Sequence, residues 1–190
     1  MASEGPNNPS AATTSAEAPW DDLNWADPTN VYTSNDARAT NFASLTTAYS
    51  YVLRIIGFGF AVPGDATVDG ILVEIEGYDM GDYAVLDLAQ LTKDGTTRVG
   101  DDYGTGQDMP DSESYFASLG GAADLWGTTW TPAEINSANF GVHVAIYHSA
   151  GKWATQYIDH VRITVTYTEG GGGTIIPQVM HHRRHGIGVS

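Results

Sequence analysis

Residues 159–168 read DHVRITVTYT, and this stretch decides the fold class. From Val161 to Tyr167 every second residue is apolar and every other one is Arg or Thr. In an extended chain this places the apolar side chains on one face, which is typical of a half-buried β-strand. The same period of two recurs in four other stretches, at residues 51–56, 71–76, 86–88 and 140–147.

Gly, Asp and Pro separate these stretches at intervals of roughly ten to twenty residues, as in all-β folds. Lys93-Asp94-Gly95 is a hairpin signal, and residues 131–135 (TPAEI) carry a capping box for one helical turn. Trp126 and Trp130 are expected to close one end of the core. We therefore expect an all-β fold, a two-layer antiparallel β-sandwich of jelly-roll type with flexible N- and C-terminal arms.

Composition divides the 190-residue chain into three zones. Residues 1–19 contain no aromatic residue and, apart from Met1, no aliphatic residue larger than Ala, so we expect a flexible N-terminal arm. Residues 20–168 hold every Trp, Tyr and Phe and are the predicted β-sandwich domain. Residues 169–190 join four glycines to an apolar patch and a basic cluster, which predicts a docking tail.

Charge and cysteine content exclude several functions. The formal net charge is −15, from 23 acidic and 8 basic residues, so we expect no nucleic acid partner. With no cysteine there is no disulfide, thiolate zinc site or cysteine nucleophile. We also find no signal peptide and no stretch of about 18 apolar residues, so we expect no membrane insertion.

The sequence contains only weak candidates for catalytic or metal-binding sites. Glu74 and Glu76 lie about 6 to 7 Å apart along a strand, within glycosidase range, but on its solvent face. The acidic loop 100–113 could bind calcium but lacks the EF-hand pattern. His143 and His160 fall on polar strand faces and could be neighbours. Three further histidines cluster in the tail, at His181, His182 and His185. We expect no enzyme, no catalytic residue, no metal site and no cofactor.

The tail is the most informative feature. Its apolar patch could add a strand to a neighbouring sheet or fill a groove, and its arginines could pair with acidic groups of another copy. The residues predicted to carry assembly are Ile175, Ile176, Val179, Met180, Arg183 and Arg184. The alternative is a tail whose basic end only balances charge.

A second function is carbohydrate binding, because sandwiches of this type often hold sugars against exposed aromatic side chains. Five aromatic residues lie in or near predicted loops and are candidate glycan contacts: Trp20, Trp25, Tyr103, Tyr115 and Trp153.

Four segments, taken in order, resemble a β-sandwich domain of predicted structural proteins of tailed bacteriophages. They are residues 57–63 (GFGFAVP), 66–76 (ATVDGILVEIE), 124–142 (starting DLWGTTWT) and 159–167 (DHVRITVTY). The resemblance implies a non-enzymatic virion component of the tail, neck or capsid surface, made in the host cytoplasm. Its expected partners are itself, as a homo-oligomer, and other virion proteins, with a surface glycan as a further possibility.

Overall fold

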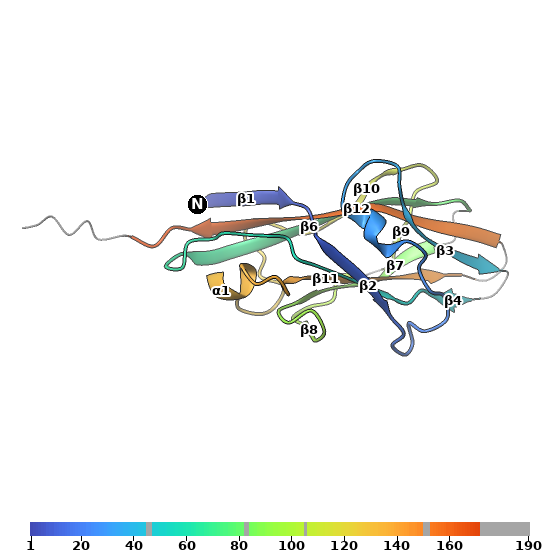
Figure 1. Ribbon diagram of the computed structural model, residues 1–190, viewed down its shortest axis with the longest axis horizontal. Coiled ribbons are helices and arrows are strands. Elements are labelled where there is room, and N and C mark those ends of the chain that lie inside the picture. The colour runs from blue at the N-terminus through green and yellow to red at the C-terminus, as the bar shows by residue number, and fades with distance from the viewer. Residues whose placement is uncertain (45–46, 82–83, 105, 150–152, 172–190) are drawn as a thin grey trace, which may run out of the picture.

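The structure is a computed structural model that describes residues 1–44, 47–81, 84–104, 106–149 and 153–171. Two antiparallel sheets face each other and enclose a shared core (Figure 1). This arrangement confirms the predicted all-β sandwich.

Sheet A has the order β1-β12-β6-β10. β3 also pairs with β12, along the first part of that strand, which β1 does not reach. Its strands are β1 (Ala2–Asn7), β3 (Ala39–Ser44), β6 (Thr67–Asp79), β10 (Ser114–Gly120) and β12 (Trp153–Thr168). The 16-residue strand β12 contains the stretch that opened the sequence argument, and it pairs with three partners along its length.

Sheet B has the order β2-β5-β11-β7-β8, with β4 beside β11 and β9 beside β7. Its strands are β2 (Ala11–Ser15), β4 (Ala48–Tyr49), β5 (Val52–Ile56), β7 (Ala84–Thr92), β8 (Arg98–Val99), β9 (Gln107–Asp108) and β11 (Gly141–His148). The chain crosses between the sheets repeatedly, as expected of a jelly-roll type. The β7–β8 hairpin turns at the predicted Lys93-Asp94-Gly95 signal, where Asp94 accepts backbone N–H bonds from Thr96 and Thr97.

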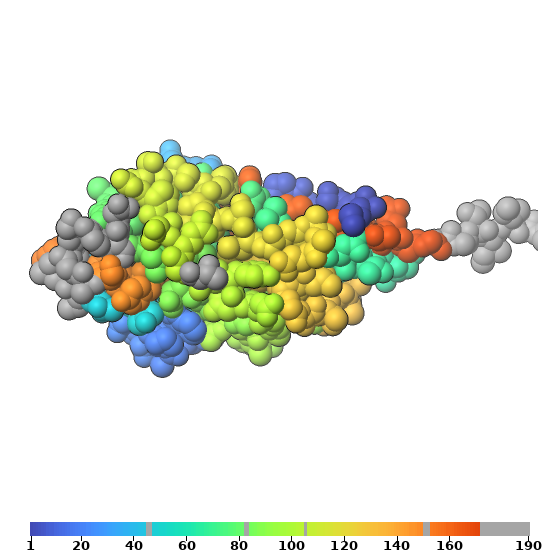
Figure 2. Space-filling model, turned by 180° about the vertical axis from the view of Figure 1, so that it is seen from behind, coloured from blue at the N-terminus to red at the C-terminus, as the bar shows by residue number. Residues whose placement is uncertain are grey.

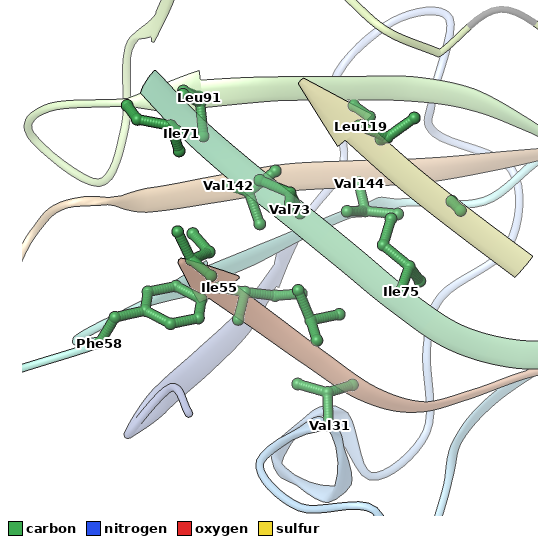
Figure 3. Close-up of a cluster of buried hydrophobic side chains, with 14 of the residues drawn as sticks. Val31, Ile55, Phe58, Ile71, Val73, Ile75, Leu91, Leu119, Val142 and Val144 are labelled. Atoms are coloured by element: carbon green, nitrogen blue, oxygen red, sulfur yellow. The ribbon is translucent and has the colours of Figure 1, made fainter. Parts of the chain in front are cut away.

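The core lies between the two sheets and follows the alternation read from the sequence. Val73 and Ile75 of β6 point toward Val142 and Val144 of β11 (Figure 3). All four side chains are fully buried. Their removal from water supplies the main driving force for pairing the sheets.

The end of the sandwich near the close of β12 is sealed by aromatic side chains, as predicted. Trp126 is fully buried, and its indole N–H donates to the Ile71 carbonyl at 3.0 Å. Trp130 packs edge-on against Phe140, with ring centroids 5.3 Å apart. Helix α1 (Pro132–Ile135) follows, and both bonds of the predicted capping box are present. A 3-10 turn, η1 (Pro28–Val31), was not expected.

The prediction of a flexible N-terminal arm at residues 1–19 is wrong. β1 pairs with β12, with Ala2 opposite Tyr167, and β2 pairs with β5. Edge strands are held by backbone hydrogen bonds, which small Ala, Ser and Thr residues make as well as large ones. The folded domain therefore begins at Ala2 rather than at Trp20.

The molecule is elongated (Figures 1 and 2), and β12 runs along most of its length (Figure 1). Fifteen residue steps at about 3.3 Å place Trp153 roughly 50 Å from Thr168. The N-terminus lies beside the C-terminal end of β12, while β3 and β4 lie at the other end (Figure 1). We call the end that carries Trp153 the tip.

Candidate functional site

A pocket lies at the tip, where segment 22–26 runs along the free edge of β3. Ala26 and Thr40 exchange two backbone hydrogen bonds of 2.8 and 3.0 Å, which fix this segment against the strand. The pocket has a volume of about 350 Å³. Its lining residues are Asp22, Leu23, Asn24, Ala26, Thr40, Asn41, Phe42 and Thr155.

Asn41 is the residue in this lining whose bonding is incomplete. It alternates with Ala39 and Ala43 along β3 and is 4% exposed. Neither its side-chain nitrogen nor its oxygen has a hydrogen-bond partner among the residues that the structure describes. A buried amide without partners is costly. Asn41 shares the inner face of β3 with Ala39 and Ala43, opposite Gln156, so its amide is shielded from the solvent-filled part of the pocket.

Two exposed aromatic side chains lie beside the pocket on the outer face of sheet A. Phe42 is 48% exposed and Trp153 is 62% exposed, and their ring centroids are 5.6 Å apart. Phe42 faces Thr155 in the strand register, so Trp153 is its diagonal neighbour. Next along β12, Tyr157 stacks on Tyr78 at 4.5 Å. The tip thus combines an apolar platform with an amide and hydroxyl-lined pocket.

This combination matches what a sugar ring requires. Its C–H faces pack on aromatic rings, while its hydroxyl groups exchange hydrogen bonds with amides, hydroxyls and carboxylates. Asp22 and Asn24 are exposed polar residues of the pocket lining and could take the second role.

The aromatic residues predicted to contact a glycan do not converge. Trp153 lies at the tip. Trp25 is 3% exposed and donates its indole N–H to the Tyr51 carbonyl, so the prediction is wrong for this residue. Trp20 covers the outer face of sheet B, bonded to Asp87 Oδ2 at 2.7 Å.

Tyr103 and Tyr115 have structural partners elsewhere. Tyr103 donates to Asp124 Oδ2 at 2.7 Å, and this bond raises the pKa of Tyr103 to about 12. Tyr115 lies 2.8 Å from His160 Nδ1, with the Arg162 guanidinium 4.0 Å from its ring centroid. Neither residue lines the tip pocket.

The paired carboxylates of β6 are poor candidates for catalysis. Glu74 receives two hydrogen bonds from Arg162, of 2.8 and 2.9 Å, which hold it as a bidentate ion pair. Glu76 lies next to it, opposite Tyr115 on β10. The Glu74 carboxylate is therefore engaged in an ion pair within the fold.

The acidic loop is largely engaged within the fold. Asp102 Oδ1 accepts the backbone N–H groups of Ala89 and Gly104, at 2.9 and 2.8 Å. Glu113, at its end, pairs with Arg38 and belongs to a group of three carboxylates with Asp36 and Asp159. Only this last residue of the loop therefore contributes to a cluster of metal-ligand type within the described chain.

The expectation that His143 and His160 are neighbours is wrong, because His143 lies in sheet B and His160 in sheet A. Burial lowers the pKa of both residues, to about 4 for His143. The tail histidines and all six predicted docking residues lie outside the described residues.

Sequence reasoning missed Asn41 and Phe42. Residues 39–44 (ATNFAS) alternate only weakly, and nothing in them marks the pairing with β12. The nearest signal was Trp153, which the sequence did single out.

No helix among the described residues is long and apolar enough to cross a membrane. Comparison with family models, curated proteins and solved structures gives no match to this chain.

Proposed function

We propose that the protein is a non-enzymatic binding module that recognises carbohydrate at its tip while its opposite end is held by a larger assembly. The observation that carries this proposal is the placement of the pocket and of the Phe42–Trp153 pair. They lie at one end of β12, and the chain continues toward its C-terminal segment from the other end.

The chemistry of the tip supports a carbohydrate ligand. Two exposed aromatic rings on a soluble acidic body are unusual unless they are covered by a partner. The pocket beside them carries the exposed polar side chains of Asp22 and Asn24. Its volume of about 350 Å³ is within the range of small-molecule sites.

Attachment through the other end is supported by the sequence of residues 172–190, which combines an apolar patch with two arginines on an acidic chain. We propose that Ile175, Ile176, Val179 and Met180 enter a groove or sheet edge of a neighbour. Arg183 and Arg184 then pair with carboxylates there, from another copy or from a second protein.

The assembly we propose is a virion, with the chain displayed on its tail, neck or capsid surface as a homo-oligomer. The support is the resemblance of four ordered segments to structural proteins predicted for tailed bacteriophages. A displayed module that is narrow, elongated and strongly acidic stays soluble at high local concentration.

The carbohydrate proposal is tested on a glycan array with the full chain, followed by calorimetric titration of the glycans that bind. We expect Trp153→Ala and Asn24→Ala each to weaken binding at least about tenfold, which corresponds to roughly 1.4 kcal/mol. Asn139→Ala is the matched control for the amide, because Asn139 is exposed and does not line the pocket. Absence of any glycan ligand, or unchanged affinity in Trp153→Ala, would overturn the proposal.

Attachment is tested separately by deleting residues 172–190. We expect the shortened chain to keep its far-ultraviolet spectrum and its glycan binding but to lose incorporation into particles. Normal incorporation would refute the role proposed for the tail. Loss of glycan binding in the shortened chain would contradict the assignment of the two roles to opposite ends.

A further inference from the structure

Three carboxylates from distant parts of the chain meet on the side of sheet A. Asp36 lies in the segment before β3, Glu113 directly precedes β10, and Asp159 lies where the β12–β6 register shifts. One oxygen from each lies within 4.8 Å of the others. Since Ca²⁺–O bonds measure about 2.3 to 2.6 Å, a single calcium ion can contact three oxygens so arranged.

The charges in this cluster do not cancel. Arg38 hydrogen-bonds both oxygens of Glu113 and contacts Asp36 Oδ1 at 2.8 Å. With all three carboxylates ionised, one guanidinium leaves two negative charges unbalanced. The charge that would complete the cluster is that of one divalent cation.

Asp159 supplies an independent observation. It is 1% exposed, and its Oδ2 accepts the backbone N–H of Asn35 at 3.1 Å. Its Oδ1 is buried and has no hydrogen-bond partner in the part of the chain that the structure describes. A buried carboxylate oxygen left unpaired is costly, so this atom requires a ligand that the protein itself does not provide.

We propose that Asp36, Glu113 and Asp159 form a binding site for one Ca²⁺ ion. The carboxylates are hard ligands of the type calcium prefers, and water can complete the coordination because Asp36 is exposed. Mg²⁺ suits the site less well, because it demands a near-ideal octahedron with bonds of about 2.0 to 2.1 Å.

A cation here would fasten one segment of the chain. Residues 33–38 leave the sheet after the Tyr32–His160 bridge and return at Ala39, the first residue of β3. One ion bound by both Asp36 and Asp159 would tie this segment to β12. The segment ends directly before β3, the strand that carries Asn41 and Phe42. The site itself is distinct from the tip pocket, and it does not depend on the proposed function.

The test is calorimetric titration of the full chain with Ca²⁺ at pH 7.5. We expect one ion per chain with a Kd below about 1 mM, as in other modest calcium sites. Mg²⁺ should bind at least about tenfold more weakly.

The variants Asp159→Asn and Glu113→Gln should each weaken Ca²⁺ binding at least about tenfold. Asp65→Asn is the matched control, because it removes an equal charge from the exposed turn before β6. Thermal unfolding with and without Ca²⁺ gives a second readout, in which the wild type and Asp65→Asn are stabilised and the site variants are not. If Asp159→Asn fails to fold, the Ca²⁺ affinity of Glu113→Gln alone tests the proposal.

Absence of heat and of thermal stabilisation at 10-fold the expected Kd would overturn the proposal. Equal affinity in the wild type and in Glu113→Gln would overturn it as well, because the bound ion would then lie elsewhere. Glycan binding is measured apart from these titrations, so either proposal can fail without the other.

Discussion

Acidification should destabilise the protein through His143, which lies on β11 in the middle of sheet B. The side chain is fully buried, and its Nε2 lies 3.3 Å from the Gly95 carbonyl, to which it can donate. Nδ1 has no partner among the described residues. Arg54 and Arg98 lower the pKa of His143 further, while Glu17, which pairs with both arginines, offsets part of their effect. Protonation of this ring would therefore place a charge in a buried environment.

The size of the effect follows from the pKa of His143. Burial lowers this pKa to about 4 in the folded chain, against about 6.5 in an unfolded one. Because the unfolded state binds the proton more tightly, the free energy of unfolding falls as pH drops from about 6.5 to about 4. Over the interval from pH 7 to pH 4.5 the loss is about 2 kcal/mol.

The measurement is urea unfolding of the wild type and of His143→Gln at pH 7 and at pH 4.5. Gln keeps a donor for the Gly95 carbonyl but does not titrate. The pKa of Asp159 is raised to about 6 and that of His160 is lowered by burial, so both also affect the pH dependence and the comparison uses the difference between the two proteins. Relative to the wild type, the free energy of unfolding of the variant should rise by about 2 kcal/mol from pH 7 to pH 4.5. An unchanged difference would show that His143 is not the buried neutral group described above.

Three further predictions concern the fold. Deleting residues 1–16 should lower the free energy of unfolding by more than about 3 kcal/mol in urea, because it removes an edge strand from each sheet; a loss below about 1 kcal/mol would restore the flexible-arm interpretation. Trp126→Phe should cost about 2 to 3 kcal/mol, because the Ile71 carbonyl loses its donor and a cavity opens. Thr131→Ala should cost about 1 kcal/mol by removing the helix cap, and an unchanged midpoint would argue against that cap.

The central strands of both sheets could be predicted from the sequence, because their side chains face water on one side and the core on the other. Val161, Ile163 and Val165 carry that pattern plainly. The capping box at Thr131 could be predicted equally well, since it depends on local hydrogen bonds between residues three apart in the sequence. Local chemistry and strict alternation were sufficient in these places.

The edges and the sites could not be predicted in the same way. β1 and β2 owe their places to backbone pairing with strands 37 or more residues away, and such pairing produces no pattern in the Ala and Ser residues of these strands. The cluster of Asp36, Glu113 and Asp159 depends on a register shift in β12 and on two loops. Sequence placed Glu113 in an acidic loop but gave no reason to join it with residues 77 and 46 positions away.

The continuous run of β12 has a mechanical consequence. If the protein is pulled between its tip and its C-terminal segment, the load passes along one 16-residue strand. The hydrogen bonds from β12 to β1, β3 and β6 lie across that direction, so they must slide and break in groups rather than one after another. A module built this way should resist stretching far better than it resists peeling from an edge.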